Sequence, residues 1–171
     1  KTVPIRRIEM FPTMRRHLQQ LDEAKAYEIL SKASHAVLSV TDPTTGYAYA
    51  VPISHTVDGN HLYIHSAPMG LKISALKANP KVSVCVVEQD EIHPERLTTY
   101  FRSVIAFGTA TFETDLDQKR KALMRLVEKY APGFETQGQE EAEPKLNYIA
   151  IIDIAIEHIT GKESIELVEK K

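Results

Sequence analysis

The stretch that decides the fold is YIHSAPMGLKISALKANPKVSVCVV, residues 63–87, which predicts a strand, a loop of small residues, a helix and a second strand. Gly70 closes the loop and tolerates backbone angles that other residues avoid. Lys72 lies in the first turn of the helix, whose free N–H groups and positive dipole end attract phosphate. With the Ser66 hydroxyl as a further donor, these groups predict a small anion-binding pocket. Asn79-Pro80 then ends the helix.

A turn that binds only water is the competing interpretation of the same residues. Glycine often precedes a helix, and a lysine in the first turn opposes the helix dipole unless an anion compensates it. The other elements of the chain therefore have to decide whether Lys72 meets a ligand.

Bulk composition narrows the class of protein. A chain of 171 residues usually forms one domain, and its formal charge of −2 with 26% charged residues spread along the chain announces no basic face, so nucleic acid is not expected as a partner. No apolar stretch is long enough to span a bilayer, and the N-terminus lacks a signal-peptide pattern. We therefore expect a cytoplasmic protein with no membrane partner. The single Cys85 lies in the apolar run 82–87 and is expected to be a small buried residue.

The region before the loop predicts a helix followed by an antiparallel meander. Asp22 is a candidate N-cap for a helix that ends near Ser34. Three β-prone runs follow, separated by turn residues at 42–46 and 58–60; they are 36–41, 47–57 and 61–65.

The region after residue 87 predicts further strands and one more helix. A charged stretch at 88–96 leads into a β-prone run at 98–112, and Thr114 is a candidate N-cap for a helix with an apolar stripe. Residues 131–146 contain glycine, proline and glutamate and are expected to form an exposed loop. A last strand begins at Ile149. Six to seven short, mostly antiparallel strands with inserted helices predict a small β-barrel flanked by helices.

Several motifs in this order resemble the FMN-binding split-barrel family related to pyridoxamine 5'-phosphate oxidase; they lie at 36–40, 46–53, 58–67 and 70–82. TTYFRSVIAFGTA at 98–110, LVEKY at 126–130 and IEHITGK at 156–162 resemble the branch that contains the nitroimidazole-resistance (Nim) proteins. The resemblance covers residues 14–162. It implies that residues 1–171 form a single FMN-binding domain.

The resemblance also implies a homodimer of split barrels with one FMN, or alternatively FAD, at each of two sites along the subunit interface. Lys72 would meet the flavin phosphate, in agreement with the pocket derived from the loop and helix. The other implied flavin contacts are His65 and Ser66 near the phosphate and ribityl chain, Val51, Pro52, Ile53 and Ser54 along the isoalloxazine, and Ser103 after Arg102. Arg102 is expected to reach the phosphate or to form an ion pair.

Two departures from the family pattern bear on activity. The oxidases carry an Arg-Lys pair before the helix, whereas Leu71 precedes Lys72 in this chain. The chain has no Trp and ends GKESIELVEKK, without the Trp and Arg-rich segment that the oxidases use around flavin and substrate. Oxidation of vitamin B6 is therefore not expected. The Nim-like branch implies a flavin-dependent reductase of a small-molecule electron acceptor, such as the nitro group of an imidazole drug.

A binding protein remains the alternative, in which flavin or haem is stored, sensed or carried without turnover. His65 is the candidate active-site acid and equally a candidate structural histidine, and His55 could face the ligand or solvent. His61 and His65 lie on one face of a strand about 13 Å apart, too far for one metal ion. Tyr100, Phe101 and Phe107 are expected to pack in the core or a dimer interface.

Overall fold

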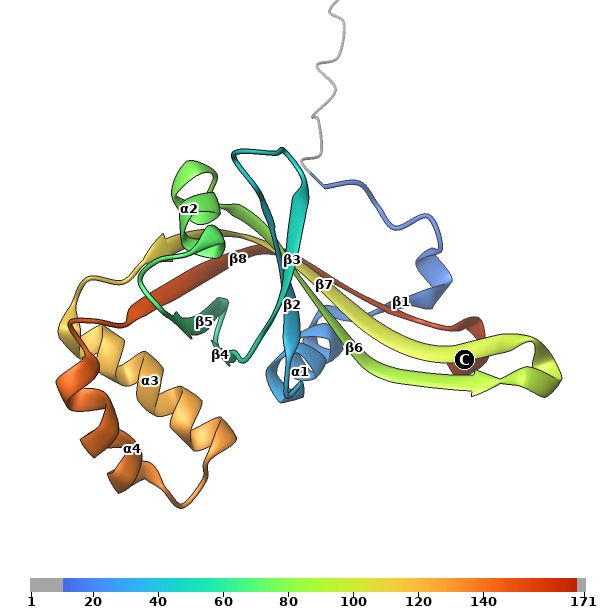
Figure 1. Cartoon of the computed structure of the whole chain (residues 1–171). Coiled ribbons are helices and arrows are strands. Elements are labelled where there is room, and N and C mark those ends of the chain that lie inside the picture. The colour runs from blue at the N-terminus through green and yellow to red at the C-terminus, as the bar shows by residue number, and fades with distance from the viewer. Residues whose placement is uncertain (1–10, 169–171) are drawn as a thin grey trace, which may run out of the picture.

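A computed structural model describes residues 11–168, in which an antiparallel sheet is flanked by helices (Figure 1). Residues 1–10 and 169–171 lie outside this range. The expectation about the N-terminus and the end of the segment GKESIELVEKK therefore fall outside the described residues. The strands are β1 Gln20–Leu21, β2 Ala36–Thr41, β3 Ala48–Ile53, β4 Thr56–Asp58, β5 His61–Ser66, β6 Lys81–His93, β7 Thr98–Phe112 and β8 Ala150–Glu163. The helices are α1 Glu23–Lys32, α2 Leu71–Ala78, α3 Leu116–Tyr130 and α4 Glu135–Ala142, with short 3-10 turns at His17–Gln19, Pro94–Arg96, Glu143–Lys145 and Ile165–Leu167.

The sheet curls into a barrel. Its two edge strands are joined by a short chain connection and not by hydrogen bonds between them. Its strand order is β3-β2-β6-β7-β8-β5-β4, with β1 added to β8, so β3 and β4 form the two ends of the path. Only Ser54 and His55 separate these two strands in the sequence. The two edges of the sheet must therefore meet, which produces a split barrel. The expected fold, mainly β with flanking helices, is confirmed.

The barrel interior is filled by aliphatic side chains that alternate along the strands. On β6, Val82, Val84 and Val86 point inward, and on β7 Val104 and Ala106 oppose them. Helix α1 closes one opening of the barrel, because Ala26, Ile29 and Leu30 belong to the same buried cluster. Asp22 caps this helix as expected, with its carboxylate 2.7 Å from the backbone N of Lys25.

The structure corrects four expectations about individual elements. The run 47–57 divides into β3 and β4, which together with the two-residue β1 raises the strand number to eight. The N-cap of α3 is Asp115, whose carboxylate accepts a bond from the N–H of Gln118, and not Thr114. Cys85 is half-buried on the outer face of the sheet, because Val84 and Val86 take the inward positions.

The fourth correction concerns residues 131–146, which contain helix α4 where a loop was expected. Gly138 makes this helix possible, since a Cβ there would lie 2.7 Å from both methyl groups of Val127 on α3. The two helices can thus approach closely and enclose a second small core with Leu123, Leu126 and Ala142.

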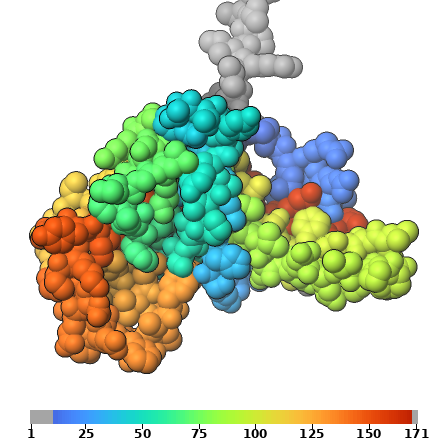
Figure 2. All heavy atoms as spheres, viewed as in Figure 1, coloured from blue at the N-terminus to red at the C-terminus, as the bar shows by residue number. Residues whose placement is uncertain are grey.

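The β6–β7 hairpin extends well beyond the body of the molecule (Figure 2). The charged stretch after Val87 continues β6 to His93, because β7 pairs with it as far as Thr98.

Among residues 11–168, no helix combines the length and the apolar character needed to cross a bilayer.

Candidate functional site

The residues expected to bind phosphate lie where β5 passes into α2. Gly70 is the N-cap residue of α2 and has a φ of 115°. Because glycine has no side chain, the first N–H groups of the helix receive no side-chain cap. Ile73, Ala75 and Leu76 anchor the helix in the barrel core. The core contacts therefore fix the position of the exposed helix start.

Lys72 is a half-buried cation at this helix start. No acidic side chain of residues 11–168 forms an ion pair with it. Burial lowers the pKa of its ammonium group below the usual range, because desolvation penalises the charged form. A bound anion would relieve this penalty.

His65 and Ser66 form the end of β5 beside Lys72. They pair with Ile151 and Ala150 at the beginning of β8, and the His65 side chain is exposed. Desolvation lowers the pKa of His65, and the charge of Lys72 lowers it further. A cation, a second protonatable group, a hydroxyl and uncapped N–H groups make a donor set that fits a phosphate.

The segment Val51–Ser54 lies along the open edge of the barrel. Val51, Pro52 and Ile53 belong to β3, which pairs with β2 on one side and is an edge of the sheet on the other. Ile53 is buried, so only its backbone is available to a ligand, while Pro52 and Ser54 are exposed. The segment can therefore offer backbone groups to a flat ring.

Within one chain, Arg102 and Ser103 lie beside the opposite end of β8 from Lys72. Ser66 pairs with Ala150 at the first residue of β8, whereas Arg102 pairs with Glu163 at its last residue. At 3.3 Å per residue these ends are about 40 Å apart along the strand, and Figure 1 shows α2 and the C-terminal end of β8 well separated. One chain thus brings Lys72, His65 and Ser66 together but does not bring Arg102 and Ser103 to them.

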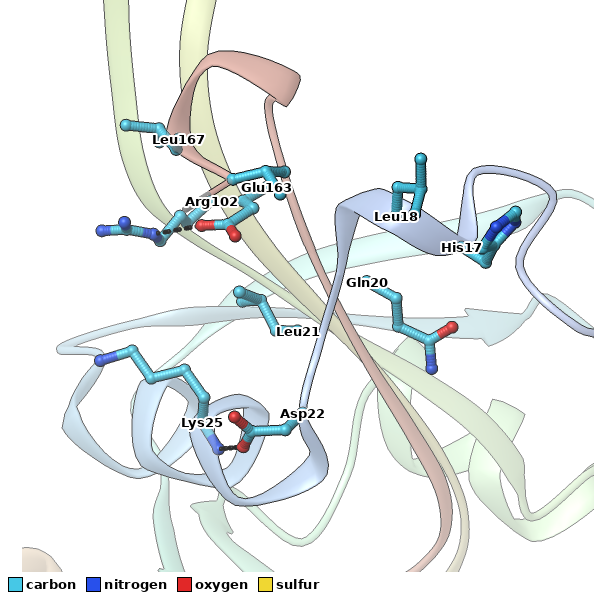
Figure 3. Close-up of a pocket in the computed structure, with 10 residues that line it drawn as sticks. His17, Leu18, Gln20, Leu21, Asp22, Lys25, Arg102, Glu163 and Leu167 are labelled. Atoms are coloured by element: carbon cyan, nitrogen blue, oxygen red, sulfur yellow. Dashed lines mark hydrogen bonds and ion pairs between the residues drawn. The ribbon is translucent and has the colours of Figure 1, made fainter. Parts of the chain in front are cut away.

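Arg102 forms an ion pair, as one interpretation of the sequence expected. Its Nε donates to the Glu163 carboxylate at 3.0 Å, and its Nη1 lies 3.4 Å from the amide oxygen of Gln89. This pair lines a cleft of about 1000 Å³ between the N-terminal segment and the ends of β7 and β8 (Figure 3). The cleft was missed in the sequence because residues 11–21 show no periodic pattern, and Glu163 lies far from them in the chain.

His55 has a structural position and faces neither a ligand cleft nor solvent. It is fully buried, and its Nε2–H donates to the carbonyl oxygen of Leu30 at 2.7 Å. Its backbone carbonyl accepts a bond from Lys129 at 2.9 Å, and its N–H donates to the hydroxyl of Tyr130. Burial lowers the pKa of His55 to about 4. The neutral imidazole therefore joins α1, the β3–β4 corner and the end of α3.

Other histidines and aromatic residues lie away from the phosphate pocket. His61 contacts Asp153 at 2.7 Å on the outer surface. Phe107 is partly exposed on the outer face of the sheet with Phe11 against it, whereas the ring of Tyr100 packs at a tilt against His93 in the projecting hairpin. Among the described residues, no group of three His, Cys, Asp or Glu side chains is arranged to hold a metal ion.

Comparisons with known proteins agree with this architecture. The sequence profile of the family described as pyridoxamine 5'-phosphate oxidase matches residues 22–163. A comparison with curated proteins gave no significant match.

Several solved structures share the fold. A candidate 5-nitroimidazole antibiotic resistance protein from Bacteroides thetaiotaomicron is 22% identical, with 84% of this chain and 86% of that chain covered and a TM-score of 0.71. An FAD and haem binding protein from Mycobacterium smegmatis is 21% identical, covers 90% and 77%, and has a TM-score of 0.73. An FAD-binding protein from Mesorhizobium loti is 25% identical, covers 85% and 96%, and has a TM-score of 0.60.

Proposed function

The chain belongs to the pyridoxamine 5'-phosphate oxidase family, and we propose that it is a flavin-dependent oxidoreductase. The proposed flavin is FMN, with FAD as the alternative. The observation that carries this proposal is Lys72, a half-buried cation without an acidic partner among residues 11–168, beside the uncapped start of α2. Desolvating an ammonium group without compensation is unfavourable, so the site is suited to an anionic ligand.

The residues around Lys72 fit the flavin in their chemistry. Ser66, the N–H groups of α2 and Lys72 would hold the phosphate, and His65 would add a donor in place of the arginine that Leu71 replaces. The open edge of β3 would lie along the isoalloxazine. When bound, the flavin supplies the electron transfer, and the protein supplies position and shielding from water.

We further propose that two copies of the chain complete each site. Lys72 and Arg102 lie at opposite ends of β8 and cannot contact one flavin within one chain. The outer face of the sheet also exposes apolar side chains on neighbouring strands, with Val87 58% and Ile105 41% exposed. A second copy seated on this face would bury them and bring its own Arg102 and Ser103 to the site.

For the reaction, we propose reduction of a small-molecule acceptor, with nitro groups of the nitroimidazole type as the first candidates. The structural likeness to the Bacteroides protein supports this choice. The alternative is a flavin- or haem-binding protein without turnover, which the likeness to the Mycobacterium smegmatis protein favours. Turnover of a reduced nicotinamide with a nitro acceptor distinguishes the two.

The first experiment is the visible spectrum of the purified protein with mass identification of the released chromophore. Bound FMN or FAD supports the proposed function and haem favours the alternative, whereas a protein that carries no chromophore and does not take up added flavin contradicts both. Lys72→Ala should weaken flavin binding by about 1.5 to 3 kcal/mol, as expected for a charge-assisted bond. Lys77→Ala, in the last turn of the same helix, is the matched control and should leave the dissociation constant unchanged.

Sedimentation of the flavin-loaded protein tests the dimer independently. A flavin-loaded monomer would contradict the shared site and leave the flavin proposal intact.

A further inference from the structure

One cleft among the described residues lies apart from the expected phosphate site. Figure 3 shows three segments around it: residues 17–25, Arg102 on β7, and residues 163–168. Its volume of about 1000 Å³ is at the upper end of the range of small-molecule sites. Lys72 and His65 do not line it.

The wall formed by the N-terminal segment is held in place by backbone pairing. Strand β1 pairs with β8 through Gln20 with Lys162 and Leu21 with Gly161. A Cβ on Gly161 would lie 2.9 Å from the Cβ of Leu21, so the glycine permits the close approach of the two strands. The pairing of β1 with β8 therefore fixes the position of this wall of the cleft.

The charges that line the cleft are already compensated within the protein. Arg102 pairs with Glu163, whose side chain is only 13% exposed. Lys25 pairs with Glu28 at 3.1 Å, and the Asp22 carboxylate caps α1. An ionic ligand would have to displace one of these partners, so the cleft favours a neutral ligand.

The polar groups that remain open are mainly hydrogen-bond donors. Within residues 11–168, Nη2 of Arg102 has no hydrogen-bond partner, and neither does the side-chain amide of Gln20. Gln20 pairs with Lys162 and Arg102 pairs with the next residue, Glu163, so the two side chains lie on opposite faces of the sheet. Nη2 of Arg102 is therefore the donor that is open beside Glu163, and it can donate to an oxygen acceptor on a ligand. Carbonyl and nitro oxygens suit this donor without bringing a full charge next to Glu163.

The rest of the lining is apolar and leaves room for a ring. Leu18 lines the cleft and is 69% exposed, and Leu21, Leu167 and Val168 are half-buried around it. Covering such side chains with a flat aromatic molecule removes apolar surface from water on both partners.

We propose that this cleft binds the electron acceptor, and that the acceptor is a neutral, planar molecule with nitro or carbonyl oxygens directed at Arg102. The role as acceptor rests on the proposed function, since Arg102 is a residue implied to lie beside the flavin of a second copy. Binding in the cleft itself rests only on its lining residues.

The test is equilibrium binding of nitrobenzene and 4-nitrobenzoate to the full flavin-loaded chain, followed by NMR or calorimetry. The two probes share the ring and the nitro group, and only the second carries a full charge. Nitrobenzene should bind at least tenfold more tightly, and Leu18→Ser should weaken its binding several-fold. Leu97→Ser is the matched control, because Leu97 is 96% exposed at the tip of the β6–β7 hairpin and away from the cleft.

Three outcomes would overturn the proposal: equal or tighter binding of 4-nitrobenzoate, equal weakening by the two leucine substitutions, or nitrobenzene binding to flavin-free protein alone. The last result would mean that the flavin itself fills the cleft. Failure of the proposed function gives a different result. A chain that takes up no flavin but binds nitrobenzene in a Leu18-dependent way would retain the cleft as a binding site. Only the role of the ligand as electron acceptor would then be lost.

Discussion

Protonation of His55 should destabilise the fold as the pH falls from about 6.5 to about 4. The imidazole is fully buried, its Nε2–H donates to Leu30, and its Nδ1 has no partner within residues 11–168. A proton on Nδ1 would create a buried charge beside Lys129 and His35, which also disfavour it. The folded protein therefore holds the pKa of His55 at about 4, compared with 6.5 for an exposed histidine.

The magnitude follows from the difference between these two pKa values. Each pKa unit corresponds to about 1.4 kcal/mol, so a difference of about 2.5 units gives roughly 3.5 kcal/mol. Because the folded pKa is the lower one, the unfolded chain binds the proton more readily. The stability contributed by neutral His55 is complete above pH 6.5, and about 2.5 kcal/mol of it is lost by pH 4.5.

Urea unfolding of the wild type and of His55→Gln between pH 4.5 and pH 7.5 measures this effect. The glutamine keeps an N–H donor for Leu30 but does not titrate, so its free energy of unfolding should fall less steeply with acid. The two curves should approach each other by about 2.5 kcal/mol over this range. His17→Gln removes an exposed histidine and should follow the wild type. Parallel curves for the wild type and His55→Gln would refute the reasoning, because carboxylates would then account for the whole acid dependence.

Flavin should bind more tightly as the pH falls through the lowered pKa of His65, because its protonated form adds a cation for the phosphate, and His65→Asn should flatten this dependence in fluorescence titrations. Gly138→Ala should lower the free energy of unfolding by about 1 to 3 kcal/mol, since the added methyl would overlap Val127; an unchanged thermal midpoint would contradict the close packing of α3 and α4. Ile105→Glu should convert the proposed dimer into a monomer in sedimentation experiments and weaken flavin binding with it, because the outer sheet face would then carry a charge.

The sequence was sufficient for elements whose residues carry strong local signals. The bounds of β2 and β7 agree with the expected runs 36–41 and 98–112, because β-branched and aromatic residues fill them and turn residues flank β2. Helix α2 begins after Gly70 and ends at Ala78, with Asn79 as its C-cap, as expected. The family inferred from the motifs is also confirmed by the profile match over residues 22–163.

Elements that depend on distant packing were wrong or missing in the sequence-based prediction. Helix α4 is rich in glutamate and contains Gly138, so its local signal favours a loop, and only its contact with Val127 explains the helix. The charged end of β6, for which the sequence predicts no element, is a strand because β7 pairs with it.

The candidate site divides in the same way. Ser66, Gly70 and Lys72 lie within seven residues of one another, so the sequence by itself determined that they share a loop and a helix start. Only the tertiary structure decided that Arg102 lies at the far end of β8, that His55 is buried, and that residues 17–25 form a cleft with Glu163. The physical reason is that backbone angles and helix caps depend on neighbouring residues, whereas strand register and burial depend on segments that meet only when the barrel closes.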